Sequence, residues 1–240
     1  MSKSNLITIF FTYLFSVLLL LLTFKEQLTV FILLQNSLFF LFISYLIFKF
    51  FSTTELLRFS FASKITYIRL TISILLLTAS IASSRDAAIF RVFYNESTFI
   101  ILALISLLLD GLDGFIARRY NDTSKFGELF DQESDNFLMF VLSISLYINK
   151  DIGLYIFLIP AYRYIFITLM TKYSWLKNTL PDSILRKSAC VMTTLLMIIS
   201  HEAYFNEYMF NFIINLALFI ITFSFSKDII WLYRNKYEKD

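Results

Sequence analysis

The sequence predicts an all-α integral membrane protein, and three observations lead to that class. Hydrophobic residues make up 58% of the 240 residues, and the mean hydropathy is +0.70. Only 16% of the residues are charged, against about 25% in a typical globular domain. Eight apolar stretches occupy most of the chain, and a helix that crosses a bilayer needs about 20 apolar residues. A soluble domain, a disordered chain and a nucleic-acid-binding module are poor fits, so we expect no nucleic-acid partner.

The first two predicted helices span residues 6–22 and 28–48. The first follows Lys3 and has the length of a signal-peptide apolar region, but the Leu-Leu-Leu-Thr-Phe-Lys-Glu segment after it lacks the small residues of a cleavage site. We therefore expect an uncleaved transmembrane helix. Segment 51–63 mixes Leu and Phe with Ser, Thr and charged residues, which is typical of a short amphipathic helix in the membrane interface or of a linker.

Six more apolar stretches follow this segment. They span residues 65–83, 98–117, 129–148, 153–171, 188–200 and 210–226. The 188–200 stretch is short for a bilayer helix, and the 98–117 and 129–148 stretches carry carboxylates at their facing ends. We predict two N-terminal transmembrane helices (1–50), the amphipathic segment or linker (51–63) and a six-helix transmembrane domain (64–240), eight transmembrane helices in total.

The basic residues predict how this chain lies in its membrane. If the N-terminus is cytoplasmic, 15 of the 21 Lys and Arg residues fall in the cytoplasmic segments and four in the outside loops. Short cytoplasmic loops are enriched in Lys and Arg. The asymmetry predicts a multi-pass protein with both termini inside and an even number of spans; in a bacterium this would be the cytoplasmic membrane.

Four aspartates occupy the inner ends of the fourth and fifth predicted helices: Asp110, Asp113, Asp131 and Asp135. On a helix that turns 100° per residue, Asp113 lies 300° on from Asp110, and Asp131 and Asp135 share one face as an i, i+4 pair. Because a cytoplasmic loop joins the two antiparallel helices, all four carboxylates can converge. The rise of the helix puts Asp110 about 18 to 20 Å below the outer surface, within the inner leaflet.

Such a cluster must be neutralised, protonated or exposed to water, because ionised carboxylates repel each other and are costly to desolvate. Hard oxygen ligands suit Mg²⁺ or Mn²⁺, and two such ions can clamp a pyrophosphate for in-line displacement. Gly114 and Ala117 lie on the same helix face as the aspartates and leave room for a nucleotide, and Arg118 can bind phosphate oxygens. The alternative is a set of surface charges that cap two helix ends.

The motif Asp-x2-Asp-Gly-x2-Ala-Arg-x8-Gly-x3-Asp-x3-Asp at 110–135 resembles that of the CDP-alcohol phosphotransferases (CDP-alcohol phosphatidyltransferases). The resemblance extends more loosely over residues 62–240. Lys64-Ile-Thr-Tyr-Ile-Arg69 is similar to the start of the family's first core helix, and Lys187 to a recurrent lysine. The implied fold is a six-helix catalytic core preceded here by two extra helices, and the family also implies a homodimer.

The resemblance implies phospholipid synthesis. An alcohol hydroxyl attacks the lipid-side phosphorus of a CDP-linked donor and CMP leaves; the inner-leaflet position of the site favours CDP-diacylglycerol as that donor. Asp110, Asp113 and Asp131 would hold two Mg²⁺ or Mn²⁺ ions, and Asp135, at the edge of this metal site, would take the proton from the acceptor. The CDP pocket would be lined by Gly114, Ala117, Arg118 and Gly127.

The acceptor alcohol, with or without a phosphate of its own, is not assigned by the sequence. Gln132 and Asn136 replace the Pro and Lys of phosphatidylglycerophosphate synthases, and the serine-rich version of phosphatidylserine synthases is also missing. Candidate residues for an acceptor or lipid phosphate are Arg69, Arg163 and Lys187. The two intramembrane arginines could instead pair with carboxylates or extend to the headgroups, and Lys187 also fits the positive-inside rule.

Three other functions stay open from the sequence alone. A soluble CDP-alcohol could react with a lipid acceptor, as in the choline and ethanolamine branch of the family. A divalent-cation or proton-coupled carrier would also place carboxylates in the membrane, but it predicts acidic residues that continue toward the outer side. A non-catalytic membrane scaffold would be expected to lose part of the motif, and here the motif is intact.

Overall fold

The computed structural model describes residues 3–24, 30–51, 61–83, 96–119, 125–178, 180–181, 183–202 and 205–235, and in these residues it contains helices and no strand. The α-helices of this described part are α1 (Lys3–Phe24), α2 (Val30–Phe51), α3 (Phe61–Ser83), α5 (Glu96–Arg119), α6 (Lys125–Lys150), α7 (Leu158–Lys172), α8 (Ile184–Ile199) and α9 (Glu207–Arg234). Two short 3-10 helices, η2 (Leu154–Phe157) and η3 (Ser174–Lys177), flank α7.

These helices coincide with the eight apolar stretches, so the all-α class is confirmed. Four spans are long and apolar enough to cross a membrane by length and composition: Val30–Ile47, Ser63–Ser83, Leu154–Lys172 and Glu207–Arg234. Helices α5 and α6 carry the acidic residues, and α8 has only 16 residues. The eight-span topology and the division of the chain at residues 50 and 63 therefore remain predictions. Residues 52–60 of the amphipathic segment lie outside the described residues.

Polar residues mark several helix ends. The Ser183 hydroxyl accepts a hydrogen bond from the Arg186 backbone N–H at the start of α8, and the Asn206 side chain accepts one from the Met209 N–H at the start of α9. The chain leaves α6 through Asp151, whose φ of 51° lies in the left-handed region that Asn and Asp tolerate best after Gly. These residues fix where the later helices start and stop.

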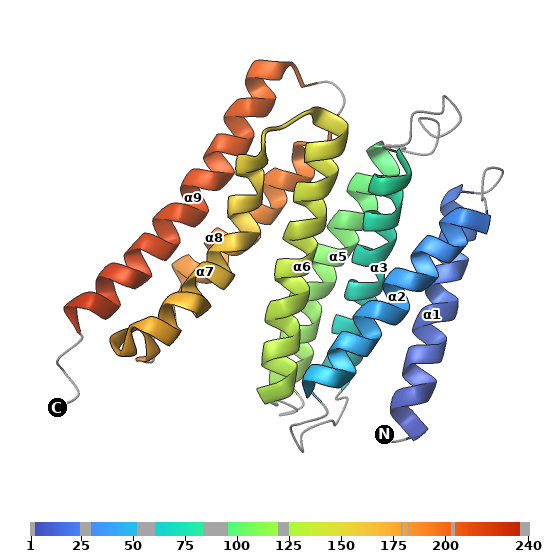
Figure 1. Cartoon of the computed structure of the whole chain (residues 1–240), viewed down its shortest axis with the longest axis horizontal. Coiled ribbons are helices and arrows are strands. Elements are labelled where there is room, and N and C mark those ends of the chain that lie inside the picture. The colour runs from blue at the N-terminus through green and yellow to red at the C-terminus, as the bar shows by residue number, and fades with distance from the viewer. Residues whose placement is uncertain are drawn as a thin grey trace.

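The helices form an up-and-down bundle with α3, α5 and α6 at its centre (Figure 1). Helices α1 and α2 pack against α3 on one side, and α7, α8 and α9 continue the bundle on the other. Helix α1 begins and α9 ends at the same end of the bundle (Figure 1). This is the arrangement that an even number of spans requires.

Helix α3 is the most buried of the four apolar spans, with 78% of its window inside the protein. Its small hydroxyl residues allow neighbouring helices to approach closely, and four of them donate a hydrogen bond to the carbonyl four residues earlier: Thr71, Ser73, Thr78 and Ser80. The hydroxyl groups are thus satisfied within the helix, as an apolar environment demands. Arg69, which lies in the middle of α3, is consequently enclosed by the bundle.

A buried polar network fixes the two N-terminal helices to α3. Asn36 of α2 donates to the Ser16 hydroxyl of α1 at 2.9 Å and accepts from Thr78 of α3 at 3.4 Å, and none of these three side chains is exposed. Further along, the hydroxyls of Ser44 and Tyr67 lie 2.6 Å apart. The N-terminal helices are therefore packed onto the central helix by specific hydrogen bonds as well as by apolar contacts.

We expect Asn36→Leu to loosen this hairpin and destabilise the protein by about 1 kcal/mol, because hydrogen bonds between membrane helices contribute about that much each. The apparent melting temperature in detergent should fall by roughly 2 to 4 °C for a chain of this size. Leu38→Ala is the control, because Leu38 lies on the same helix and is 66% exposed. An Asn36→Leu protein that melts like the wild type would show that the network contributes nothing.

Candidate metal centre

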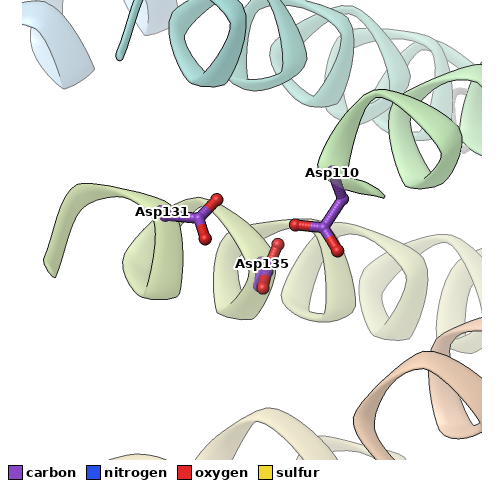
Figure 2. Close-up of side chains that lie close together, drawn as sticks. All are labelled: Asp110, Asp131 and Asp135. Atoms are coloured by element: carbon purple, nitrogen blue, oxygen red, sulfur yellow. The ribbon is translucent and has the colours of Figure 1, made fainter. Parts of the chain in front are cut away.

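Helices α5 and α6 bring three of the predicted aspartates together. Asp110 lies on α5, Asp131 and Asp135 lie one turn apart on α6, and their carboxylates point toward one another (Figure 2). One oxygen from each carboxylate lies within 4.8 Å of the others. The convergence predicted from the i, i+4 spacing is therefore confirmed for these three residues; we call them the aspartate triad. Their side chains are 22 to 36% exposed, so ions and water can enter.

Arg69 of α3 inserts its guanidinium group into the aspartate triad. Its Nη1 atom lies 2.9 Å from Asp110 Oδ1 and donates to Asp131 Oδ1 at 2.7 Å, and its Nη2 atom donates to Asp135 Oδ1. The Arg69 side chain is only 2% exposed. Three helices therefore meet at one charged centre.

These four residues lie at similar depths in their helices. Counting about 1.5 Å per residue from the end of each helix where α1 also begins, Arg69 is about 12 Å along α3 and Asp110 about 14 Å along α5. Asp131 and Asp135 are about 9 Å and 15 Å along α6. A mid-helix arginine at the same depth as three carboxylates could have been recognised as their partner from the sequence. The pairing with carboxylates expected as one alternative for Arg69 is thus observed, and its partners are the three aspartates.

The aspartate triad fits a divalent metal. With all groups ionised, three carboxylates against one guanidinium leave two uncompensated negative charges in the described residues, which is the charge of one divalent ion. The donors are carboxylate oxygens, which Mg²⁺ and Mn²⁺ prefer, and no cysteine or histidine belongs to the cluster. Partial exposure leaves space for the water molecules that Mg²⁺ usually keeps.

The other predicted metal and CDP ligands lie on the adjoining turns. Asp113, Gly114, Ala117 and Arg118 belong to the last turns of α5, but their side chains lie outside the described residues. Gly127 is half-buried in the first turn of α6. The roles predicted for these five residues remain predictions.

Arg163 forms a second charged group, on another side of α6. Its Nη2 atom lies 2.7 Å from Glu133 Oε1, and its Nη1 atom donates to Gln132 Oε1 at 3.0 Å. The Tyr164 hydroxyl donates to the other Glu133 oxygen at 3.1 Å. Glu133 is two residues from both Asp131 and Asp135, so it faces away from the aspartate triad. Of the alternatives for Arg163, pairing with a carboxylate is the one observed. The sequence favoured a solvated charge for Glu133, although it directly follows Gln132 and lies three residues before Asn136, the two residues that break the family pattern.

Lys187 lies in the first turn of α8, where its side chain is exposed. Its neighbour Arg186 pairs with Asp228 of α9 at 3.5 Å. None of the ion pairs described above joins Lys187 to the aspartate triad. Its predicted role in binding a phosphate stays a prediction.

The fold and the site together define an all-α membrane protein with an acidic centre between two core helices. Residues 59–225 match the family model of the CDP-alcohol phosphatidyltransferases, and the chain therefore belongs to that family. The matched region begins just before α3, so α1 and α2 precede it.

Curated relatives are similar to a shorter part of the chain. A protein of Helicobacter pylori strain ATCC 700392 / 26695, named CDP-diacylglycerol–serine O-phosphatidyltransferase, is 45% identical over 58 residues, and its counterpart in strain J99 / ATCC 700824 matches equally well. The match covers 22% of this chain and 24% of each relative. No solved structure is significantly similar to this chain.

Proposed function

We propose that this protein transfers a phosphatidyl group from CDP-diacylglycerol to a small alcohol, with release of CMP. The observation that carries the proposal is the convergence of Asp110, Asp131 and Asp135 within 4.8 Å in a chain of this family. The active site would face the cytoplasm, at the level of the inner-leaflet headgroups. The protein would thus act in phospholipid synthesis.

The aspartates would have two roles, metal binding and proton transfer. Asp110 and Asp131 would hold the Mg²⁺ or Mn²⁺ ions, two per site with Asp113, and Asp135 would share one of them. Bound divalent ions supply positive charge that neutralises the pyrophosphate and the leaving CMP. Asp135 would accept the proton of the acceptor hydroxyl, and for this one of its oxygens must stay clear of the ions, because a carboxylate held by metal is a poor base.

The decisive experiment measures CMP release by the purified protein in the presence of Mg²⁺ or Mn²⁺. CDP-diacylglycerol is offered with a panel of alcohols, and serine comes first because the curated relatives are named for it. Glycerol 3-phosphate and inositol phosphate test phosphorylated acceptors. The proposal fails if no acceptor yields CMP while a known relative is active in the same assay.

The alternative donor is a soluble CDP-alcohol with a lipid acceptor. Competition separates the two: CDP-diacylglycerol should suppress turnover of a CDP-alcohol far more strongly than the reverse if the lipid-linked donor is the natural one. Lipid profiles of cells with and without the protein would then name the acceptor, because its headgroup should disappear.

Three cations are candidates for binding the acceptor or a phosphate group. Arg163 is a candidate because it is an intramembrane cation on α7 whose guanidinium pairs with Glu133 and is still 23% exposed. Helix α8 packs against both α5 and α6, so it lies near the aspartate triad. Lys187 and Arg69 are the other candidates for a phosphate. A homodimer remains an expectation from the family.

We expect Gly114→Ala to raise the KM for the CDP-linked donor about tenfold, because the added methyl group would occupy space reserved for the nucleotide. Gly111→Ala is the matched control. A Cβ atom at Gly111 meets no atom within 4 Å, and Ala favours the helix, so this variant should keep the wild-type KM. Equal KM values for the two variants would remove Gly114 from the donor pocket.

A further inference from the structure

Among the described residues that contact the aspartate triad, Arg69 is the most deeply buried charged residue. It lies on the central helix at 2% exposure, with Tyr67 close by in contact with rings of both α2 and α6. A guanidinium enclosed in this way is stable only when carboxylates compensate its charge. Its three contacts with Asp110, Asp131 and Asp135 provide that compensation.

The same contacts also reduce the repulsion between the three carboxylates. Three ionised groups whose oxygens lie within 4.8 Å would repel each other strongly in a membrane-embedded bundle. A planar guanidinium with several N–H donors can bind more than one of them at a time. Each contact uses the Oδ1 atom, and a carboxylate has a second oxygen, so an arginine and a metal ion can share the same ligands.

We propose that Arg69 is a resident cation of this site: it holds the aspartate triad together when divalent ions are absent, and its charge weakens the binding of those ions. It is a positioning residue, since it acts through the three carboxylates. This inference rests on the proposed metal site but not on the identity of the donor or acceptor. It adds a function for an arginine that the sequence offers as a phosphate-binding candidate, a partner of carboxylates or a cation that extends to the headgroups.

The test compares Arg69→Gln with the wild type in two measurements that need no substrate. In EDTA, the apparent melting temperature of R69Q should fall by roughly 10 °C, because three carboxylates lose their common partner. Saturating Mn²⁺ should restore most of this loss. In a titration followed by electron paramagnetic resonance of free Mn²⁺, R69Q should bind Mn²⁺ roughly ten- to a hundredfold more tightly, because a repelling positive charge has been removed.

Three further variants distinguish the effect of the Arg69 charge on metal binding from its effect on stability. Arg69→Lys keeps the charge and should keep the Mn²⁺ affinity within about threefold of wild type. Arg69→Gln/Asp131→Asn removes one charge of each sign and should recover part of the metal-free stability lost in R69Q. Lys150→Gln is the control, because Lys150 pairs with Glu96 at the opposite end of α6, and it should leave Mn²⁺ binding unchanged.

The proposal is overturned if R69Q is less stable but binds Mn²⁺ with wild-type or weaker affinity, since a purely structural arginine would behave in that way. It is also overturned if R69Q does not fold even in saturating Mn²⁺, because a divalent ion would then be unable to replace the guanidinium. CMP release is measured separately: an active wild type with no Arg69 effect rejects only this inference, and an inactive wild type with the expected Mn²⁺ effect rejects only the proposed function.

Discussion

Asp135→Asn should bind CDP as tightly as the wild type but release CMP at least about 10³-fold more slowly, because loss of a general base typically costs 10²- to 10⁴-fold. The amide keeps the shape of the side chain but removes its negative charge and with it the ability to accept a proton. Asp135 lies one turn above Asp131 in α6 and shares Arg69 with the other carboxylates, so its position should persist in the variant. Steady-state CMP release and equilibrium CDP binding measure the two effects.

The control for this prediction is Asp151→Asn. Asp151 is exposed beyond the C-terminal end of α6 and has a left-handed backbone conformation that Asn adopts equally well, so turnover should not change. Turnover by Asp135→Asn above about a tenth of the wild-type rate would remove Asp135 as the base. The proton would then pass to water or to another group.

Asp131→Asn should have the second large effect, on metal binding. Removing one of three converging ligands should weaken Mn²⁺ binding at least about a hundredfold, since even outer-shell changes at metal sites cost 10- to 100-fold.

Removal of metal by EDTA should likewise stop CMP release by the wild type, and added Mg²⁺ or Mn²⁺ should restore it. Full activity in EDTA, or unchanged Mn²⁺ binding by Asp131→Asn, would contradict the metal centre.

Much of the fold follows from the sequence because apolar length and charge spacing are local signals. Each apolar stretch became a helix, and the i, i+4 spacing of Asp131 and Asp135 was enough to place both carboxylates on one face of α6. The family motif at 110–135 runs from the last turns of α5 to the first turns of α6. These features needed no knowledge of the tertiary structure.

The side-chain contacts that the sequence does not predict depend on which helices are neighbours. Arg69 is 41 residues before Asp110 in the chain, and only the packing of α3 against both α5 and α6 brings it into the site. The Arg163–Glu133 pair needs α7 to lie on the side of α6 away from the aspartate triad. Apolar periodicity cannot supply such contacts in a membrane protein, because lipid and protein surfaces are both apolar there.

The central claim is that the aspartate triad binds divalent ions beneath the headgroups. The most direct measurement is anomalous X-ray scattering from Mn²⁺ in crystals of the wild-type protein grown with Mn²⁺ and CDP. We expect anomalous peaks in contact with the carboxylate oxygens of Asp110 and Asp131, at about 2.0 to 2.3 Å, with CDP phosphates on the opposite side of the ions. Well-occupied Mn²⁺ peaks elsewhere in the protein, with the three carboxylates bound only to Arg69, would contradict the account.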